Sequence, residues 1–307
     1  MSAQFAGKNI SAKIRCIIVY IFAPMYSNAE AIIEYYTKCD NAYRDAWGLD
    51  RNMQLNLGLW KKGTKSLSEA LQHLNAEIAE LSGMKSSTKH LDAGCGVGGT
   101  AIFMAKNYGT NSTGINLVQH QIERAAKNAE IFKVSDSAQF HLMDYTKTDF
   151  KDETFDVVTG IESICYAEPK SAFLKEAFRI LKPGGRLVLA ENLQAKALLN
   201  QKEQECLYDN AFHGCGVKSL DTAEEYLTNL TKLGFKDAKC LDYTNLIKPS
   251  IKRLRRFYYP AWAYNKYHQL MGKPFSEIQL ANTKMCFYLQ SSLKKGLWSY
   301  GIIRAVK

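Results

Sequence analysis

The feature that most constrains the fold is residues 89–99, where a short apolar run ends in an acid and four glycines fall within six residues. A helical pattern follows directly. The stretch therefore predicts a strand, a turn without side chains, and a helix whose free N–H groups face the turn. Glycine suits such a turn because the backbone takes unusual angles and a ligand approaches closely. Gly94, Gly96 and Gly98 fit GxGxG, and with Gly99 in place of Gly98 the stretch fits GxGxxG, so alone it indicates only a nucleotide-like cofactor.

Segments typical of strands and of helices alternate through the rest of the chain. Strand-like segments cover residues 112–117, 139–143, 155–161, 186–191, 237–243 and 297–306, and helical runs cover 66–82, 118–132, 171–181 and 221–233. This alternation predicts an α/β fold with a doubly wound, mostly parallel, seven-stranded Rossmann-like sheet. Ligands of such sheets bind beyond the carboxyl ends of the strands, and the glycine turn falls at one of those ends.

The remaining segments predict one domain with appendages. Residues 1–29 form an N-terminal extension, 30–65 an aromatic-rich helical lid, and 66–307 the catalytic domain, with a helical insertion at 245–296 before the last strand. Within the extension, an apolar run follows three cations but is shorter than the roughly 20 residues that span a bilayer. Three interpretations of this extension remain open: an amphipathic cap, a segment that touches a membrane, and sequence upstream of the true start at Met25.

The cysteine pattern limits the kinds of site and the cellular location that we expect. Eight cysteines are scattered without a CxxC pair, which is untypical of zinc clusters and disulfide frameworks. We therefore expect reduced thiols, a cytoplasmic location and no metal site.

The net charge of +10 is concentrated in residues 245–296, where ten cations and one anion give +9 and leave about +1 for the other 255 residues. We call this segment the basic aromatic cap, because nine Phe, Tyr and Trp residues accompany its cations.

Residues downstream of the glycine turn decide between its two patterns. Asp92 stands two residues before the first glycine, Asp144 and Tyr145 close the third strand, and a Lys-Pro-Gly-Gly turn at 182–185 leads into the fifth. Taken in this order, residues 89–192 resemble the class I S-adenosylmethionine-dependent methyltransferases. An acid beside the turn also suits a sulfonium cation and would repel a pyrophosphate, which disfavours a nicotinamide dinucleotide.

The resemblance implies S-adenosylmethionine as the cofactor. It implies that Asp92 and the glycine turn hold the methionine part and the ribose, and that Asp144 accepts a hydrogen bond from the adenine amine. The implied cofactor-binding residues are Tyr35, Tyr36, Asp92, Gly94, Cys95, Gly96, Gly98, Asn116, Leu117, Gln121, Asp144, Tyr145 and Ile161. Asn116 replaces the acid that usually ends the second strand, so its ribose contacts lack charge-assisted strength.

Two segments resemble a narrower group, the tocopherol, sterol, mycolic-acid and sugar methyltransferases that act on small molecules. One is residues 114–121 and the other is the aromatic segment 35–60, which is similar to the lid of that group. The resemblance implies that Tyr35 or Tyr36 covers the cofactor. Asn56 stands where this lid usually has histidine, which leaves the role of that position open.

The turn after the fourth strand is the predicted acceptor site. Related O-methyltransferases often have a Glu-Ser-x-x-His pattern there, whereas this chain has Cys165 and Tyr166 where the histidine could fall after Glu162. A tyrosine with a pKa of about 10 is a poor base at neutral pH, although its ring stabilises a cation. We therefore expect Glu162, Cys165 and Tyr166 to contact the acceptor, and methylation of carbon or nitrogen ahead of oxygen. The alternative, that Cys165 and Tyr166 merely line the wall of the pocket, agrees with the sequence equally well.

Tyr166, Glu191 and His213 are the candidate catalytic residues. Glu191 ends the fifth strand at the predicted active-site edge, where it could orient the acceptor or take a proton. His213 follows the fifth strand and its helix, a region that tends to hold acceptor-site residues in the fold that the resemblance implies. A lone histidine is, however, more often structural.

The basic aromatic cap has four interpretations. It could seat the protein on an anionic membrane surface, hold a phosphate or carboxylate of the acceptor, bind nucleic acid, or form a solvated charged helix. Nucleic acid is disfavoured because the resembling group acts on small molecules. The partners we expect are therefore a small hydrophobic acceptor and, as an open alternative, an anionic membrane.

Together these features predict methyl transfer from S-adenosylmethionine to a small, largely apolar acceptor that is isoprenoid-, sterol- or lipid-like. Two alternatives remain. One is a small-molecule O-methyltransferase, and the other is a protein that keeps the fold and binds the cofactor without turnover. Asn116 and the missing acceptor-site histidine are the reasons for the second alternative.

Overall fold

The centre of the fold is a seven-stranded sheet with the order β3-β2-β1-β4-β5-β7-β6. The strands are β1 (Lys89–Ala93), β2 (Asn111–Asn116), β3 (Ala138–Leu142), β4 (Phe155–Ile161), β5 (Leu181–Gln194), β6 (Lys236–Asp242) and β7 (Trp298–Val306). The first five run parallel to one another, and β7 is antiparallel to both β5 and β6. The predicted α/β class and the mostly parallel sheet are confirmed. The structure is a computed structural model that describes residues 28–307, so predictions for residues 1–27 lie outside it.

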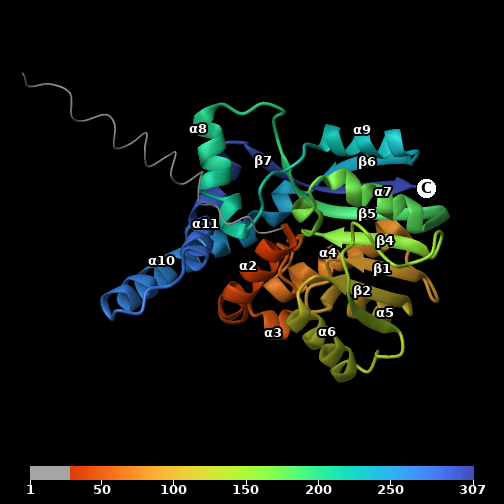
Figure 1. Cartoon of the computed structure of the whole chain (residues 1–307), viewed down its shortest axis with the longest axis horizontal. Helices are drawn as coiled ribbons and strands as arrows, with labels where there is room; N and C mark the ends of the chain where they lie inside the picture. The colour runs from red at the N-terminus through yellow and green to blue at the C-terminus, as the bar shows by residue number, and fades with distance from the viewer. Residues whose placement is uncertain (1–27) are drawn as a thin grey trace, which may run out of the picture.

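Helices flank this sheet (Figure 1). The long ones next to it are α4 (Leu67–Ser82), α5 (Gly99–Tyr108), α6 (Gln119–Ile131), α7 (Lys170–Ile180) and α9 (Ala223–Leu233). Their starts follow local chemistry, since Ser66 accepts from the N–H of Glu69 at the start of α4. At the start of α9, Thr222 and Glu225 form a reciprocal capping box.

The strand order reverses next to β1, which lies between β2 and β4. A crevice forms at such a reversal because the connections on either side leave in opposite directions. The glycine turn leads from the carboxyl end of β1 to α5, so it lies at this crevice. The ligand site predicted from the glycine pattern therefore coincides with the switch point of the sheet.

Strand β5 is longer than the predicted 186–191. Helix α7 ends at Ile180, as the Lys-Pro-Gly-Gly stop predicts, but β5 begins at the next residue. Leu181 pairs with Phe155 and Arg186 pairs with Val157, so residues 182–185 bulge out of the ladder. Gly184, with φ +76°, allows this bulge.

Two helical parts cover the carboxyl edge of the sheet. The N-terminal lid consists of α2 (Asn28–Ala42), the π-helical turn Tyr43–Trp47 and α3 (Leu49–Asn52). The cap is a hairpin of α10 (Thr244–Leu270) and α11 (Glu277–Lys294) between β6 and β7, and the outer part of α10 projects from the body (Figure 1). Asn282 Nδ2 of α11 donates to the hydroxyl of Tyr35 in α2 at 2.8 Å, which ties the cap to the lid. Short helical segments, α8 (Gln201–Gln204), Glu205–Asp209 and Phe212–Cys215, follow β5.

Candidate active site

A cavity of about 240 Å³ lies between the lid, the carboxyl edge of the sheet and the cap. Ten of the thirteen predicted cofactor residues line it: Tyr36, Asp92, Gly94, Cys95, Gly96, Asn116, Leu117, Gln121, Tyr145 and Ile161. The three predicted acceptor residues, Glu162, Cys165 and Tyr166, line it as well. Residues that are far apart in the sequence thus meet in one chamber, with the predicted cofactor residues and the predicted acceptor residues on its wall.

The glycine turn forms the floor of the cavity. Gly94, Gly96 and Gly98 have φ angles of +78°, +54° and +89°, which side chains other than glycine rarely adopt. The N–H groups of Gly94 and Cys95 donate to the carbonyl of Ile115 at 2.9 and 3.0 Å, which fixes the turn against β2. A Cβ on Gly96 would meet no atom within 4 Å. The absence of a side chain at Gly96 therefore leaves room for a ligand.

Gly98 lies outside the cavity wall, so the structure does not support its predicted contact with the cofactor. A Cβ at this position would lie 2.8 Å from the ring of Phe140 and 3.0 Å from Ala125. Glycine is needed there because α5 packs closely on the sheet and because the residue begins the helix with a left-handed backbone.

Asp92 is the buried acid of the cavity. Its Oδ2 has no hydrogen-bond partner among the described residues. Burial raises the pKa of Asp92 to about 7, while hydrogen bonds from the backbone of Ala101 and from Thr159 oppose this shift. The Thr159 hydroxyl also contacts Nε2 of His90 at 2.8 Å. An unsatisfied carboxylate oxygen in a buried site fits a cationic ligand group.

This arrangement predicts that cofactor binding depends on pH. Because the raised pKa of Asp92 is about 7, the free protein holds this carboxyl protonated below that value, and binding a cation must release the proton. We expect the affinity for S-adenosylmethionine to rise about tenfold per pH unit from 5.5 to 6.5 and to level off above 7. Isothermal calorimetry at several pH values checks this. Asp92→Asn should remove the slope and weaken binding, whereas Asp156→Asn, a surface acid, should keep it.

The second strand ends in a small network of amides. Asn116 Nδ2 donates to Gln121 Oε1 at 2.7 Å, and Asn116 Oδ1 accepts from the N–H of Leu117 at 2.8 Å. The network holds both side chains in place on the cavity wall. Asn116 thus keeps an orientation that an unsupported amide would lack, at the position where the resembling enzymes have an acid.

Asp144 does not line the cavity, although its neighbour Tyr145 does. Asp144 Oδ1 accepts from the N–H and the hydroxyl of Thr146, both at 2.7 Å, and so closes its own turn. The Tyr145 hydroxyl donates to the carbonyl of Ser163 at 2.8 Å. The predicted contact between Asp144 and adenine stays a prediction, and Tyr145 connects the third-strand turn to the acceptor-site turn.

Glu162 is the acid at the acceptor end of the cavity. It follows β4 with φ +49°, a strained angle for a residue other than glycine. Its Oε1 accepts from the N–H of Leu57 in the lid at 2.8 Å and from the hydroxyl of Tyr300 in β7 at 2.9 Å. Burial raises the pKa of Glu162 to about 8. A strained, partly buried carboxyl whose pKa is raised toward neutrality is typical of a functional site.

Three tyrosine rings surround the cavity near Glu162. Tyr36 lies 5.9 Å from Tyr166 and 6.3 Å from Tyr43, measured between ring centroids. Tyr36 donates to the Tyr166 hydroxyl at 3.1 Å, and Tyr166 donates to the carbonyl of Cys215 at 2.8 Å. Burial raises the pKa of Tyr166 well above 10. Its phenol therefore keeps its proton at neutral pH, so Tyr166 is not suited to act as a base.

Tyr35, the other predicted lid residue, packs against the ring of Tyr36 and does not line the cavity. Its hydroxyl contacts the hydroxyl of Tyr43 and accepts a hydrogen bond from Nδ2 of Asn282, so Tyr35 joins the lid to the cap. Of the two tyrosines offered by the sequence, Tyr36 is the one that faces the cavity.

Glu191 is fully buried beneath the acceptor-site turn and does not line the cavity. Its Oε1 accepts from the N–H groups of Ser163 and Ile164 at 3.1 and 2.8 Å. These bonds hold the turn that carries Cys165 and Tyr166. The structure therefore supports a positioning role for Glu191 in place of the predicted direct contact with the acceptor or its proton.

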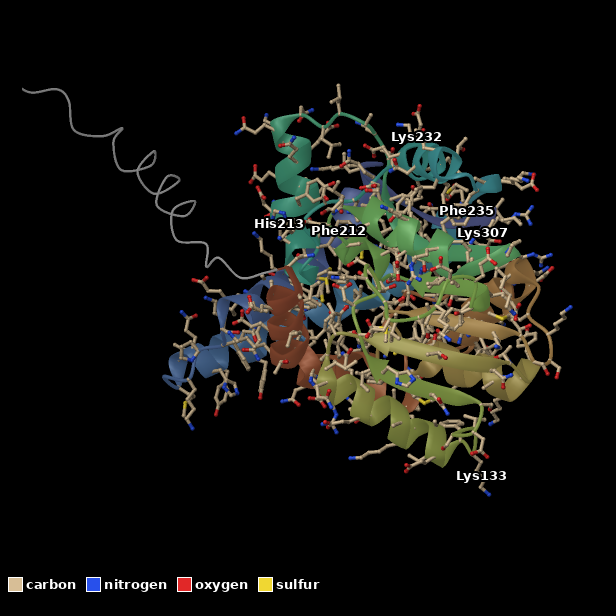
Figure 2. The ribbon with its side chains drawn as sticks, turned by 45° about the vertical axis from the view of Figure 1, so that its right-hand side comes forward. Lys133, Phe212, His213, Lys232, Phe235 and Lys307 are labelled. Carbon is tan, nitrogen blue, oxygen red and sulfur yellow. The ribbon has the colours of Figure 1, made fainter. Side chains whose placement is uncertain are left out.

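His213 is exposed outside the cavity. Its ring stacks on Tyr208 with 5.8 Å between centroids, and its Nδ1 lies 3.4 Å from Asp209 Oδ1. The preceding residue, Phe212, is buried and lines the cavity, and Figure 2 shows the two labelled residues next to each other. The short helical turn thus directs Phe212 inward, and the structure does not support a catalytic role for His213.

The cap provides a wall of the cavity that was not predicted from the sequence. Leu254, Phe257 and Ala261 of α10 line the cavity, as do Met285 and Leu289 of α11. Their spacing of three and four residues is the signal of one helix face, but the cations between them draw attention first. Among residues 28–307, no group of three metal-ligating side chains could hold an ion.

The fold and the cavity together define a Rossmann-like cofactor-dependent enzyme, and comparison with known proteins identifies which kind. Residues 91–189 match the family described as "Methyltransferase domain". The 27-O-demethylrifamycin SV methyltransferase of Amycolatopsis mediterranei is 30% identical over 66% of this chain and 74% of its own length. The chain therefore belongs to the S-adenosylmethionine-dependent small-molecule methyltransferases.

Other relatives match over shorter regions. Erythromycin 3''-O-methyltransferase of Saccharopolyspora erythraea is 37% identical over 45% of both chains, and sterol 24-C-methyltransferase of Saccharomyces cerevisiae is 32% identical over 53% of this chain and 41% of its own. The chain thus spans less than half the length of these two relatives. Among solved structures, the [4+2]-cyclase SpnF has a TM-score of 0.76 and 21% identity, over 92% of this chain and 98% of its own. At this identity the likeness shows the fold alone.

The cavity fits the family's cofactor, S-adenosylmethionine. The unsatisfied Oδ2 of Asp92 suits the positive charge of the methionine part, and the open space above Gly96 admits a ligand next to the backbone. Asn116 and Gln121 offer amide groups for the ribose on the same wall. The positions of these residues on the cavity wall are compatible with the contacts that the resemblance implied for Asp92, the glycine turn and Asn116, and the contacts themselves stay predictions.

Proposed function

We propose that this protein transfers the methyl group of S-adenosylmethionine to a carbon or nitrogen atom of a small, largely apolar acceptor without a phosphate. An isoprenoid, a sterol or another lipid-like molecule belongs to this class. The observation that carries the proposal is the composition of the cavity wall. Among the described residues, the wall holds tyrosines and the two acids Asp92 and Glu162 but no histidine, lysine or arginine.

The tyrosine rings suit an acceptor that becomes or carries a cation. Bound S-adenosylmethionine supplies an electrophilic methyl group on a positively charged sulfur. Tyr36, Tyr43 and Tyr166 line the cavity. Aromatic rings stabilise positive charge of the kind that develops on the acceptor when the new bond forms. Each ring is fixed by a hydroxyl hydrogen bond, so little reorganisation is needed at that moment.

Glu162 is the group that we assign to the proton. When a carbon–hydrogen or nitrogen–hydrogen acceptor gains a methyl group, one proton must leave, and the ionised Oε2 of Glu162 takes it. The pKa of about 8 gives the carboxylate more basicity than an ordinary glutamate has. The bonds from Leu57 and Tyr300 occupy Oε1 and leave the other oxygen for this purpose.

The lack of cations on the described cavity wall argues against a phosphorylated acceptor. A diphosphate needs arginine, lysine or a metal ion around it. The cap residues that line the cavity are instead apolar, such as Leu254 and Phe257. The relatives named above methylate both oxygen and carbon, so O-methylation with Glu162 as the base is the second candidate.

A competition assay tests the proposal. We expect methyl transfer from labelled cofactor to a steroidal or isoprenoid alkene, or to a hydrophobic amine, and none to geranyl diphosphate, with products identified by mass spectrometry. A hydrophobic alcohol tests the second candidate in the same assay. Transfer only to the alcohol or to the diphosphate contradicts the proposal. Cofactor binding without transfer to any of them would make the protein a binding protein that keeps the fold.

A further inference from the structure

We infer that the outer half of the α10–α11 hairpin, residues 252–280, docks the protein on the surface of an anionic lipid bilayer. We call this segment the hairpin tip. The inference deepens the proposed function, because it gives a lipid-like acceptor a source next to the cavity. It concerns binding to a surface, since no helix among the described residues is long and apolar enough to cross a membrane.

Large apolar side chains gather on the hairpin tip. Of the eleven that are exposed among the described residues, seven belong to this tip: Tyr259, Trp262, Tyr264, Tyr267, Leu270, Met271 and Leu280. Leu270 is 87% exposed and Met271 60%, at the turn between the two helices. Tyrosine and tryptophan favour the boundary between lipid and water, and leucine and methionine favour the acyl region.

The cations of the cap are unpaired with acids in the described part of the chain. None of the ten lysines and arginines in 245–296 forms an ion pair with a described acid, whereas Lys61, Arg124 and Arg179 of the body all do. Arg255 lies over the ring of Phe287, and Lys284 lies over that of Tyr288. The positive charge therefore remains available to an anionic surface, and each such cation contributes to binding.

The hairpin tip is continuous with the cavity. Ile251 is the last fully buried residue of α10, and Leu254, Phe257 and Ala261 beyond it line the cavity. From Leu254 the same helix continues for roughly 24 Å to Leu270, at 1.5 Å per residue. Figure 1 shows this part of α10 projecting from the body. An acceptor that leaves the bilayer along this helix meets the cavity wall first.

A nucleic acid would explain the cations but not Leu270 and Met271, because exposed aliphatic side chains gain nothing from phosphates or base stacking. A bilayer accounts for both features. Anionic lipid attracts the cations, and the acyl boundary buries the apolar turn.

Vesicle sedimentation tests the electrostatic half of the inference. We expect the protein to bind vesicles of phosphatidylcholine with 30% phosphatidylserine and to bind pure phosphatidylcholine far less. Binding to the anionic vesicles should weaken about fivefold in each of four single variants, Lys252→Gln, Arg256→Gln, Lys266→Gln and Lys273→Gln. Lys133→Gln with Lys232→Gln is the matched control, because Figure 2 shows both lysines at the surface of the body away from the hairpin. A control that loses as much affinity as the cap variants contradicts the assignment of the site.

Tryptophan fluorescence tests the apolar half. Trp262 is 50% exposed, whereas Trp47 and Trp298 are buried and Trp60 is half-buried with its Nε1 bonded to Ser250. Insertion should therefore shift the emission to the blue mainly through Trp262. Trp262→Phe should keep vesicle binding and lose most of the shift, and Leu270→Asp with Met271→Asp should reduce binding. Cofactor affinity, measured by calorimetry without vesicles, should stay the same in all these variants. That readout separates failure of docking from failure of the proposed function.

The inference is contradicted if vesicle binding does not depend on phosphatidylserine, or if vesicles leave the emission of Trp262 unshifted. It is also contradicted if the protein forms a concentration-dependent dimer without vesicles and the Leu270 and Met271 variants abolish that dimer. That last outcome would assign the exposed turn to a second copy of the chain. Salt-sensitive binding to an oligonucleotide with none to vesicles would assign the cations to nucleic acid.

Discussion

Gly96→Arg is expected to weaken the binding of S-adenosylmethionine on the order of 100-fold, or about 2.7 kcal/mol. A Cβ at Gly96 meets no atom within 4 Å, so the fold itself has room for a side chain there. That side chain would occupy the space that the cofactor needs. The arginine would also bring a cation next to a positively charged ligand and supply Asp92 with a competing partner. Calorimetry with S-adenosylmethionine and with its demethylated product measures the loss.

Gly184→Arg is the matched control for this variant. Gly184 also has a positive φ, +76°, and a Cβ there also meets nothing within 4 Å, but it lies in the bulge of β5. The left-handed backbone costs a substituted residue about 1–2 kcal/mol at either position. Both variants should therefore lose similar stability in thermal unfolding, and only Gly96→Arg should lose the cofactor. Equal cofactor affinity in the two would mean that the turn is not the cofactor site.

Glu162→Gln is expected to lower kcat by about 10²- to 10⁴-fold, the usual contribution of a general acid or base. The glutamine oxygen can still accept from the N–H of Leu57 and the hydroxyl of Tyr300, so the lid and β7 stay in place. Cofactor affinity should change little. The steady-state rate on whichever acceptor the competition assay identifies measures the effect, and Glu224→Gln on the surface of α9 is the control.

The pH profile gives an independent readout for Glu162. Its pKa of about 8 leaves the carboxyl protonated at neutral pH in the free enzyme, so the basic form grows as pH rises. We expect kcat/KM at saturating cofactor to rise with pH up to about 8 and then level off. Glu162→Gln should remove that rise. An unchanged profile in the variant would assign the proton to another group.

The fold was largely predictable because its signals are local. The glycine turn, the helix cap at Ser66 and the alternation of strand and helix segments each depend on residues close together in the sequence. The bulge at residues 182–185 was not predictable, because it follows from how β5 pairs with β4. Pro183 and Gly184 end a helix in most contexts, and here they also sit inside a strand ladder.

The candidate site was predictable only where a motif marks it. Asp92 and Glu162 stand at strand ends, and parallel strands bring such residues together. Glu191 ends the strand segment predicted from the sequence, but β5 continues to Gln194, and the orientation of Glu191 depends on the turn folded above it. The choice between Tyr35 and Tyr36 depends on the packing of α2 against α11, which no local pattern encodes.

The absence of cations on the described cavity wall has a consequence for turnover. Methyl transfer removes the positive charge from the sulfur of the donor, so the spent cofactor is less positive than the fresh one. Asp92 and Glu162 line a chamber in which no described lysine or arginine offsets their charge when they ionise. Electrostatic attraction to such a wall is weaker for the spent cofactor than for the fresh one. The wall that attracts the donor therefore also promotes exchange of the product, and product inhibition is reduced by the reaction's own change of charge.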